Sequence, residues 1–174
     1  MSNIWNKDDR IMELVVKHYN VELKASNTYS HLATVAKSLG YDNVANYLVN
    51  MATDKLTAHL PRLSGYLMQV DYVLKINQLS IPESFGILNN IQDVLNAAVK
   101  TEQKVRESVS QVTEISLAAK DFETFERMQW FVRDSIEDLE EISDLATYAS
   151  AANVNMINIE SIALSRMNKE KKEY

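Results

Sequence analysis

Residues 50–63, "NMATDKLTAHLPRL", have the spacing of an amphipathic helix, yet a lysine lies within the apolar row. Positions three or four residues apart share one face of an α-helix, and the row here reads Ala58, Lys55, Met51, Leu48 and Val44. Lys55 is its single charged member. Because an unpaired buried charge is costly, the ammonium group of Lys55 needs anionic partners from other parts of the fold.

Similar patterns extend through most of the chain and predict an all-α protein. Only three glycines and two prolines interrupt the 174 residues, so long helices are expected. We expect helices over residues 8–38, 42–68, 87–119, 121–149 and 153–170. Asp42 and Asp121 are the expected N-caps of the second and fourth helices. Pro61 lies inside the second helix and has no amide proton, which predicts a kink or bulge near His59.

Residues 69–86, "QVDYVLKINQLSIPESFG", lose the helical period and contain Pro82 and Gly86. This segment is the expected long crossover between the second and third helices. Four long helices, a crossover and a short last helix predict a four-helix bundle over about residues 8–149, followed by a fifth C-terminal helix over about residues 153–170. We expect a single domain spanning residues 1–174.

The overall composition argues against several classes of protein. Hydrophobic residues make up 46% and charged residues 24%, as in soluble globular proteins. The formal net charge of −6 argues against a nucleic-acid partner, because such binding needs a cationic surface. No apolar segment has membrane-spanning length, no signal-peptide pattern is present, and the lack of cysteine excludes thiolate metal sites. A cytoplasmic location without a membrane partner is therefore expected.

Each long helix brings an ionisable group onto or beside its apolar face near mid-length. Glu22 interrupts the row of the first helix and Glu102 that of the third, while Asp134 and Asp138 flank the row of the fourth. Carboxylates that project inward from several helices of a bundle commonly hold a pair of metal ions. Their oxygen ligands suit iron, manganese or magnesium. The alternative is that the rows are misphased by one step and these residues lie at the surface.

Three segments carry a resemblance to a known family: "VELKASNTY" (21–29), "VKTEQKV" (99–105) and "TFERMQWFVRDSIEDLEE" (124–141). They resemble the bacterial non-haem ferritins, and the similarity spans about residues 11–169. The resemblance implies a ferritin-like fold and self-assembly into a twenty-four-subunit homo-oligomeric shell. It also implies that the shell takes up iron(II) and stores it as a ferric mineral, with a di-iron ferroxidase centre inside each bundle.

The resemblance assigns metal-binding roles to particular carboxylates. Glu22 and Glu102 match the glutamate ligands of the first and third helices. Asp138 matches the residue that bridges toward the second iron. Asp134 and Glu137 match ligands of a third iron site nearby.

The second helix departs from the family pattern. Two adjacent glutamates followed three residues later by a histidine are replaced by Asp54, Lys55 and Ala58. Lys55 stands in place of the glutamate that bridges both irons. It also stands in place of the methionine that binds haem in the related bacterioferritins, so no haem is expected. Tyr29 matches the family's tyrosine beside the centre and, with Lys55, is the candidate for a role in oxidation.

We therefore expect an ammonium group at the bridging position, among Glu22, Glu102 and Asp138. Its N–H groups can satisfy carboxylate oxygens that iron would otherwise bind, and its charge repels iron. Rapid paired oxidation requires two irons about 3.5–4 Å apart. The resemblance and this substitution together predict iron storage with altered or slow oxidation.

Two other hypotheses remain open. In the second hypothesis, the protein is an active ferroxidase with a rebuilt metal site. Either a bulge turns His59 inward as a substitute ligand, or Asp54 holds a single iron together with Asp134 and Glu137. The third hypothesis is a structural bundle whose buried lysine–carboxylate cluster stores no iron. His18 is expected to be a packing or surface residue.

Overall fold

The chain is helical throughout its regular structure. The computed structural model describes residue 5 and residues 7–77, 84–151 and 154–170, with the side chains of 169 and 170 left out. The elements are α1 (Asp9–Ser38), α2 (Asp42–Asp54), the π-helical turn η1 (Lys55–His59), α3 (Leu60–Gln69), α4 (Ile91–Ala118), α5 (Phe122–Ala149) and α6 (Met156–Glu170). The predicted all-α class is confirmed.

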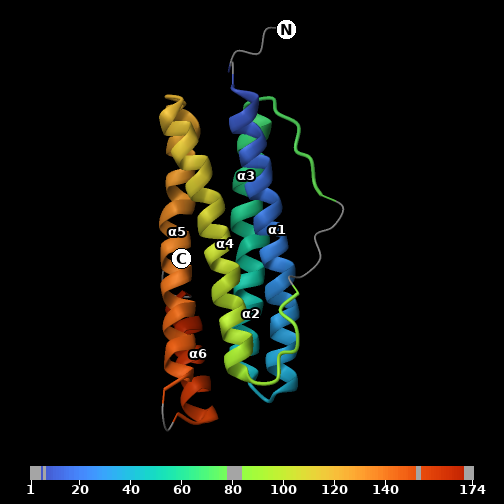
Figure 1. The fold of residues 1–174 in the computed structure, drawn as a ribbon, viewed down its shortest axis with the longest axis vertical. Coiled ribbons are helices and arrows are strands. Elements are labelled where there is room, and N and C mark those ends of the chain that lie inside the picture. The colour runs from blue at the N-terminus through green and yellow to red at the C-terminus, as the bar shows by residue number, and fades with distance from the viewer. Residues whose placement is uncertain (1–4, 6, 78–83, 152–153, 171–174) are drawn as a thin grey trace.

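Four rods lie side by side along the long axis, as Figure 1 shows. They are α1, the continuous rod α2–η1–α3, α4 and α5. Helix α3 ends at one end of the bundle and α4 begins at the other, so these two helices point in the same direction (Figure 1). The short helix α6 packs on one end of the bundle against α2 and α5. This is the predicted four-helix bundle with a fifth C-terminal helix.

A buried side-chain amide of α1 holds the described start of the crossover. The Asn20 side chain donates to the carbonyl of Lys75 over 2.9 Å and accepts from the amide of Asn77 over 2.7 Å. Irregular backbone needs such partners because no helix satisfies its polar groups. Residues 78–83, which include Pro82 of the predicted crossover, lie outside the described part of the chain.

Two helix starts agree with local capping chemistry. The Asp121 carboxylate accepts from the amide of Thr124 and begins α5, as predicted. Helix α4 begins at Ile91 because Asn90 accepts from the amide of Asp93. The predicted start at residue 87 was therefore wrong by four positions, since the preceding residues form no helical turn.

A third helix start is capped from a distant part of the sequence. Asp42 is the first residue of α2, and Tyr41 precedes it without a capping side chain, so the predicted N-cap at Asp42 was wrong. Glu160 of α6 instead accepts from the amide of Val44 over 2.9 Å. Helix α6 begins at Met156, and the predicted start at 153 lies outside the described residues.

A layer of polar side chains interrupts the apolar interior at mid-length. Two apolar clusters fill the bundle, and on α1 one of them ends at Val15 and the other begins at Ala25. The buried histidine, lysine and glutamate side chains of the described chain lie near this break: His18, Glu22, Lys55, His59 and Glu102. Buried charged groups are tolerated only when they are paired, so this layer is the place to look for a site.

Candidate metal centre

The π-helical turn η1 determines which residues of the second rod face this layer. The amide of Leu60 donates to the carbonyl of Lys55, five residues earlier, so the turn holds one residue more than an α-helical turn. Pro61 follows directly and has no amide proton to continue an α-helical ladder. The bulge predicted near His59 is confirmed.

The extra residue in η1 brings His59 inward in place of Ala58. The His59 side chain is 1% exposed, whereas Ala58 is only half-buried. Regular α-helical spacing placed Ala58 in the inward row and was wrong here, because one added residue shifts every later position around the helix axis. An imidazole therefore occupies the inward position that follows Lys55.

The ammonium group of Lys55 lies among carboxylates from three helices. Its Nζ is 2.7 Å from Asp138 Oδ2 of α5, 3.2 Å from Glu102 Oε1 of α4 and 3.7 Å from Glu22 Oε2 of α1. The lysine side chain is 1% exposed. Three helices that are distant in sequence thus direct their carboxylates at one cation.

Burial and charge act in opposition on the groups of this cluster. Burial disfavours the Lys55 ammonium, yet the charges of Asp138, Glu102 and Glu22 raise the pKa of Lys55 well above its ordinary value. Burial raises the pKa of Glu102 to about 7, although Lys55 opposes the change. The pKa of Asp138 is likewise raised by burial. Because burial outweighs the attraction of the ammonium group, Glu102 and Asp138 hold protons more readily than exposed carboxylates do.

Tyr29 fixes the orientation of Glu102. Its buried hydroxyl donates to Glu102 Oε1 over 2.6 Å. Burial and the adjacent Glu102 charge raise the pKa of Tyr29 well above its ordinary value, so the phenol keeps its proton and remains a donor. The tyrosine lies beside the cluster, where the sequence resemblance placed it.

His59 joins this cluster to a second group of carboxylates. Its Nδ1 donates to Glu22 Oε1 over 2.9 Å. Its Nε2 lies 3.1 Å from Asp54 Oδ2 and 2.9 Å from Asp134 Oδ2. Burial opposes charge on the ring, but Glu22 and the two aspartates outweigh it and raise the pKa of His59 to about 11. In the described chain, Asp54, His59 and Asp134 form a three-residue group whose ligand atoms lie within 4.8 Å of one another.

Glu22 is at the centre of the hydrogen-bond network, and its carboxylate remains charged. Burial opposes the charge, but Lys55 and His59 hold the pKa of Glu22 far below its usual range. His18, on the same face of α1, places Nε2 at 3.3 Å from Glu22 Oε1 and Nδ1 at 3.2 Å from Ser108 Oγ. Burial lowers the pKa of His18 to about 4, so this ring is neutral.

Sequence reasoning missed His18 as a member of the network. The usable signal was its position four residues before Glu22, which places both on one face of α1. Glu137 was predicted as a metal ligand, but its side chain is exposed and lies outside the group of Asp54, His59 and Asp134. All the other predicted metal-binding residues lie in the two connected clusters.

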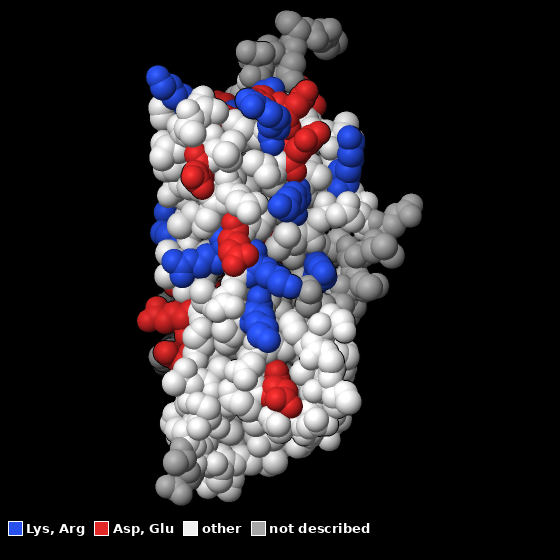
Figure 2. Space-filling model, viewed as in Figure 1, with Lys and Arg blue, Asp and Glu red and all other residues white. Residues whose placement is uncertain are grey.

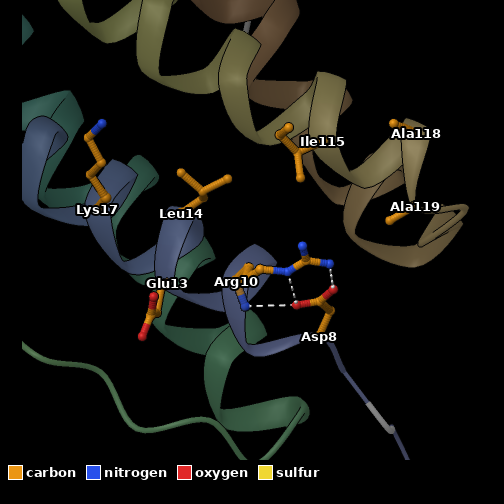
Figure 3. A pocket seen from close by; sticks show the side chains of 8 residues that line it. All are labelled: Asp8, Arg10, Glu13, Leu14, Lys17, Ile115, Ala118 and Ala119. Carbon is orange, nitrogen blue, oxygen red and sulfur yellow. Dashed lines mark hydrogen bonds and ion pairs between the residues drawn. The ribbon is translucent and has the colours of Figure 1, made fainter.

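A surface groove lies away from the buried layer of charged residues. It has a volume of about 740 Å³ and lies between the start of α1 and the end of α4, as Figure 3 shows. The Arg10 guanidinium is paired with Asp8 at its edge. None of the cluster residues lines this groove.

Charged side chains of both signs lie on the face drawn in Figure 2, where Lys and Arg are interspersed with Asp and Glu. Within the described ranges, no helix is both long and apolar enough to cross a bilayer.

Comparisons with known proteins agree on one family. A family model for the ferritin-like domain matches residues 12–150. The uncharacterized protein UU427 of Ureaplasma parvum is 28% identical over 135 residues, covering 77% of this chain and 78% of that protein. The bacterial non-heme ferritin of Escherichia coli O6:H1 is 23% identical over 128 residues, covering 74% and 76%. The crystal structure of M. penetrans ferritin is 65% identical with a TM-score of 0.89, covering 94% of this chain and 99% of that chain.

Proposed function

Because the chain belongs to the family of ferritin-like domains, we propose that it forms a twenty-four-subunit shell that takes up iron(II) and stores it as a ferric mineral. The family and the fold support iron storage in general. The 65% identity to M. penetrans ferritin over nearly the whole chain supports a role as a ferritin. Storage in the cytoplasm is part of this proposal.

Exposed apolar side chains support self-assembly. Isolated surface hydrophobes are ordinary, but many large ones on a small subunit favour contacts between copies. The large apolar residues that are more than two-fifths exposed in the described chain are Val49, Leu56, Met68, Val73, Ile76, Ile87, Ile115, Leu117, Phe122, Ile136, Met156, Ile157 and Leu164. They belong to α2, η1, α3, α4, α5, α6 and the crossover, so we expect more than one contact between copies.

The position of Lys55 supports storage with altered or slow oxidation. Its ammonium contacts Asp138 and Glu102 at distances suited to hydrogen bonds and ion pairs. The resemblance to the family assigns the bridging ligand to position 55, and a cation at that position repels a metal ion. This single observation carries the proposal that rapid paired oxidation does not take place between Glu102 and Glu22.

Aerobic iron loading tests the storage function. Purified iron-free protein receives iron(II) in air, is separated by gel filtration, and is assayed for iron in the shell fraction. We expect a large assembly that retains many irons per subunit and gains them slowly. Failure to assemble or to retain iron would leave a structural bundle with a buried lysine–carboxylate cluster.

Replacing Lys55 tests the block on oxidation. Lys55→Glu restores a bridging carboxylate beside His59, so we expect faster oxygen-dependent oxidation of iron(II), followed by absorbance of the ferric product. Lys100→Glu makes the same charge change at an exposed position of α4 and serves as the control. Equal rates in wild-type protein and Lys55→Glu would contradict the proposed block.

A second candidate function is supported by the inward position of His59. With Asp54 and Asp134 it offers donors for iron oxidation at a rebuilt site. Rapid oxygen consumption by the wild-type protein would favour this active ferroxidase over slow storage.

A further inference from the structure

The two nitrogens of His59 face different surroundings. Nδ1 faces Glu22, the carboxylate that also lies near Lys55. Nε2 faces the carboxylates of Asp54 and Asp134, which come from the end of α2 and the middle of α5. The imidazole therefore separates the lysine cluster from a second group of oxygen atoms.

The hydrogen bonds of this second group leave one oxygen unsatisfied. One Nε2–H group has a well-aligned bond to only one acceptor, and here it donates to Asp54 Oδ2. Asp134 Oδ2 is buried and lies 2.9 Å from His59 Nε2, yet no described residue gives it a well-aligned hydrogen bond. A buried carboxylate oxygen without a donor is costly, whereas a cation placed between the three groups would satisfy both aspartates at once.

The spacing of the three groups matches one side of a metal coordination shell. Two donors at right angles, each about 2.1 Å from an ion, are about 3.0 Å apart. Nε2 lies 3.1 Å from Asp54 Oδ2 and 2.9 Å from Asp134 Oδ2. All three ligand atoms lie within 4.8 Å of one another, as donors to one ion must.

We propose that Asp54, His59 and Asp134 bind one divalent transition-metal ion, and that Glu22 is a positioning residue which orients the imidazole. One imidazole and two carboxylates suit iron(II), manganese(II), cobalt(II) or zinc(II) better than magnesium or calcium. Binding releases the Nε2 proton of His59 to solvent, while the Nδ1 proton stays in the bond to Glu22. Iron(II) is the expected ion in the cell, and this choice rests on the proposed function of iron storage.

The position of Glu22 favours an orienting role over direct ligation. Imidazole ligands commonly donate their second N–H group to a carboxylate, which fixes the tautomer and the ring direction. Glu22 Oε1 accepts that bond over 2.9 Å, and His18 packs behind it at 3.3 Å. Its other oxygen lies 3.7 Å from Lys55 Nζ, so a metal ion at Glu22 would meet the ammonium group.

Lys55 also limits the number of ions. It contacts Glu102 and Asp138, the remaining carboxylates of the layer, and excludes a second ion between them. One metal ion per subunit is therefore expected in this part of the bundle.

Cobalt(II) titration of the iron-free protein tests the site without any oxidation step. Trp130 reports on binding because its ring centroid lies 5.0 Å from that of His59. A Trp5→Phe background removes the only other tryptophan. We expect one cobalt(II) per subunit, visible absorption from the bound ion and quenching of Trp130 fluorescence with the same midpoint.

Two ligand variants decide whether the site is the one described. Asp134→Asn and His59→Gln should each weaken cobalt(II) binding at least about tenfold. Glu126→Gln removes the same charge from an exposed position of α5 and should leave the affinity unchanged. Wild-type affinity in both ligand variants would overturn the site, provided circular dichroism and gel filtration show a native assembly.

Glu22→Gln separates positioning from ligation. The glutamine keeps an oxygen that accepts the Nδ1–H bond, so we expect roughly tenfold weaker binding with an unchanged cobalt(II) absorption spectrum. An altered spectrum would identify Glu22 as a ligand, and an unchanged affinity would remove its orienting role. Either result overturns that part of the inference.

Iron loading of the same preparations keeps the two proposals distinguishable. If cobalt(II) fails to bind while the shell still accumulates iron, the metal site is refuted and storage stands. If cobalt(II) binds as expected but no iron is retained, storage is refuted and the site stands.

Discussion

Lys55→Met removes one buried positive charge and keeps most of the apolar volume of the side chain. The ammonium lies 2.7 Å from Asp138 and 3.2 Å from Glu102. At an effective dielectric constant of about 20, these two attractions are each on the order of 5–6 kcal/mol before any offset. A methionine at this position makes neither of these two electrostatic attractions.

Two effects offset most of that attraction. The variant no longer has to remove an ammonium from water on folding, and the buried carboxylates can bind protons instead. Removing one partner of a buried ion pair typically lowers the free energy of unfolding by about 3–5 kcal/mol, and we expect a loss of this size at pH 7.5.

The loss should shrink as the pH falls. Without Lys55, the pKa values of Glu102 and Asp138 rise further above their unfolded values, so the folded variant holds these protons more tightly than the wild type does. For Glu102 the extra loss begins as the pH rises through its wild-type folded pKa of about 7, and it grows toward the higher pKa of the variant by up to about 1.4 kcal/mol per pH unit. A smaller deficit is expected at pH 6 than at pH 8.5.

Guanidinium unfolding followed by far-UV circular dichroism measures these differences. Wild-type and variant proteins are compared metal-free at one protein concentration, because assembly contributes to apparent stability. Lys100→Met, at an exposed position of α4, should change the free energy of unfolding by no more than about 0.5 kcal/mol. A loss below about 1 kcal/mol for Lys55→Met, or a loss independent of pH, would refute the paired-charge reasoning.

Three further predictions concern neighbouring groups. Tyr29→Phe removes the hydroxyl donor of Glu102 and should lower the free energy of unfolding by about 1–3 kcal/mol, measured by the same titration. The charged ring of His59 stabilises metal-free protein fully below its unfolded pKa of 6.5, and that stabilisation is lost as the pH rises toward about 11. His59→Gln should therefore reduce the decline in unfolding free energy between pH 7 and 9, and an unchanged slope would contradict the assignment. Glu160→Ala leaves the amide of Val44 uncapped and should cost about 1 kcal/mol, with the exchange of that amide proton accelerated in hydrogen-exchange measurements.

The sequence by itself determined the architecture and the depth of the polar layer. Apolar residues at helical spacing, together with few glycines and prolines, were enough to predict the helices, because that period depends only on local geometry. Glu22, Glu102 and Lys55 interrupt their rows near mid-length, so their meeting followed from the need to pair buried charges. Asp121 as the cap of α5 was also predictable, because its bond to Thr124 is local.

The tertiary structure alone decided the register of the second rod after Lys55 and the cap of α2. A constant α-helical spacing predicted that Ala58 faces inward, whereas the extra residue in η1 turns His59 inward, toward Asp134. The cap of α2 comes from Glu160, more than a hundred residues away, and no local pattern marks it. Register shifts and contacts between distant segments depend on how the helices pack. The sequence therefore predicted that Lys55 meets Glu22, Glu102 and Asp138, but it left the direction of His59 open and missed the role of His18.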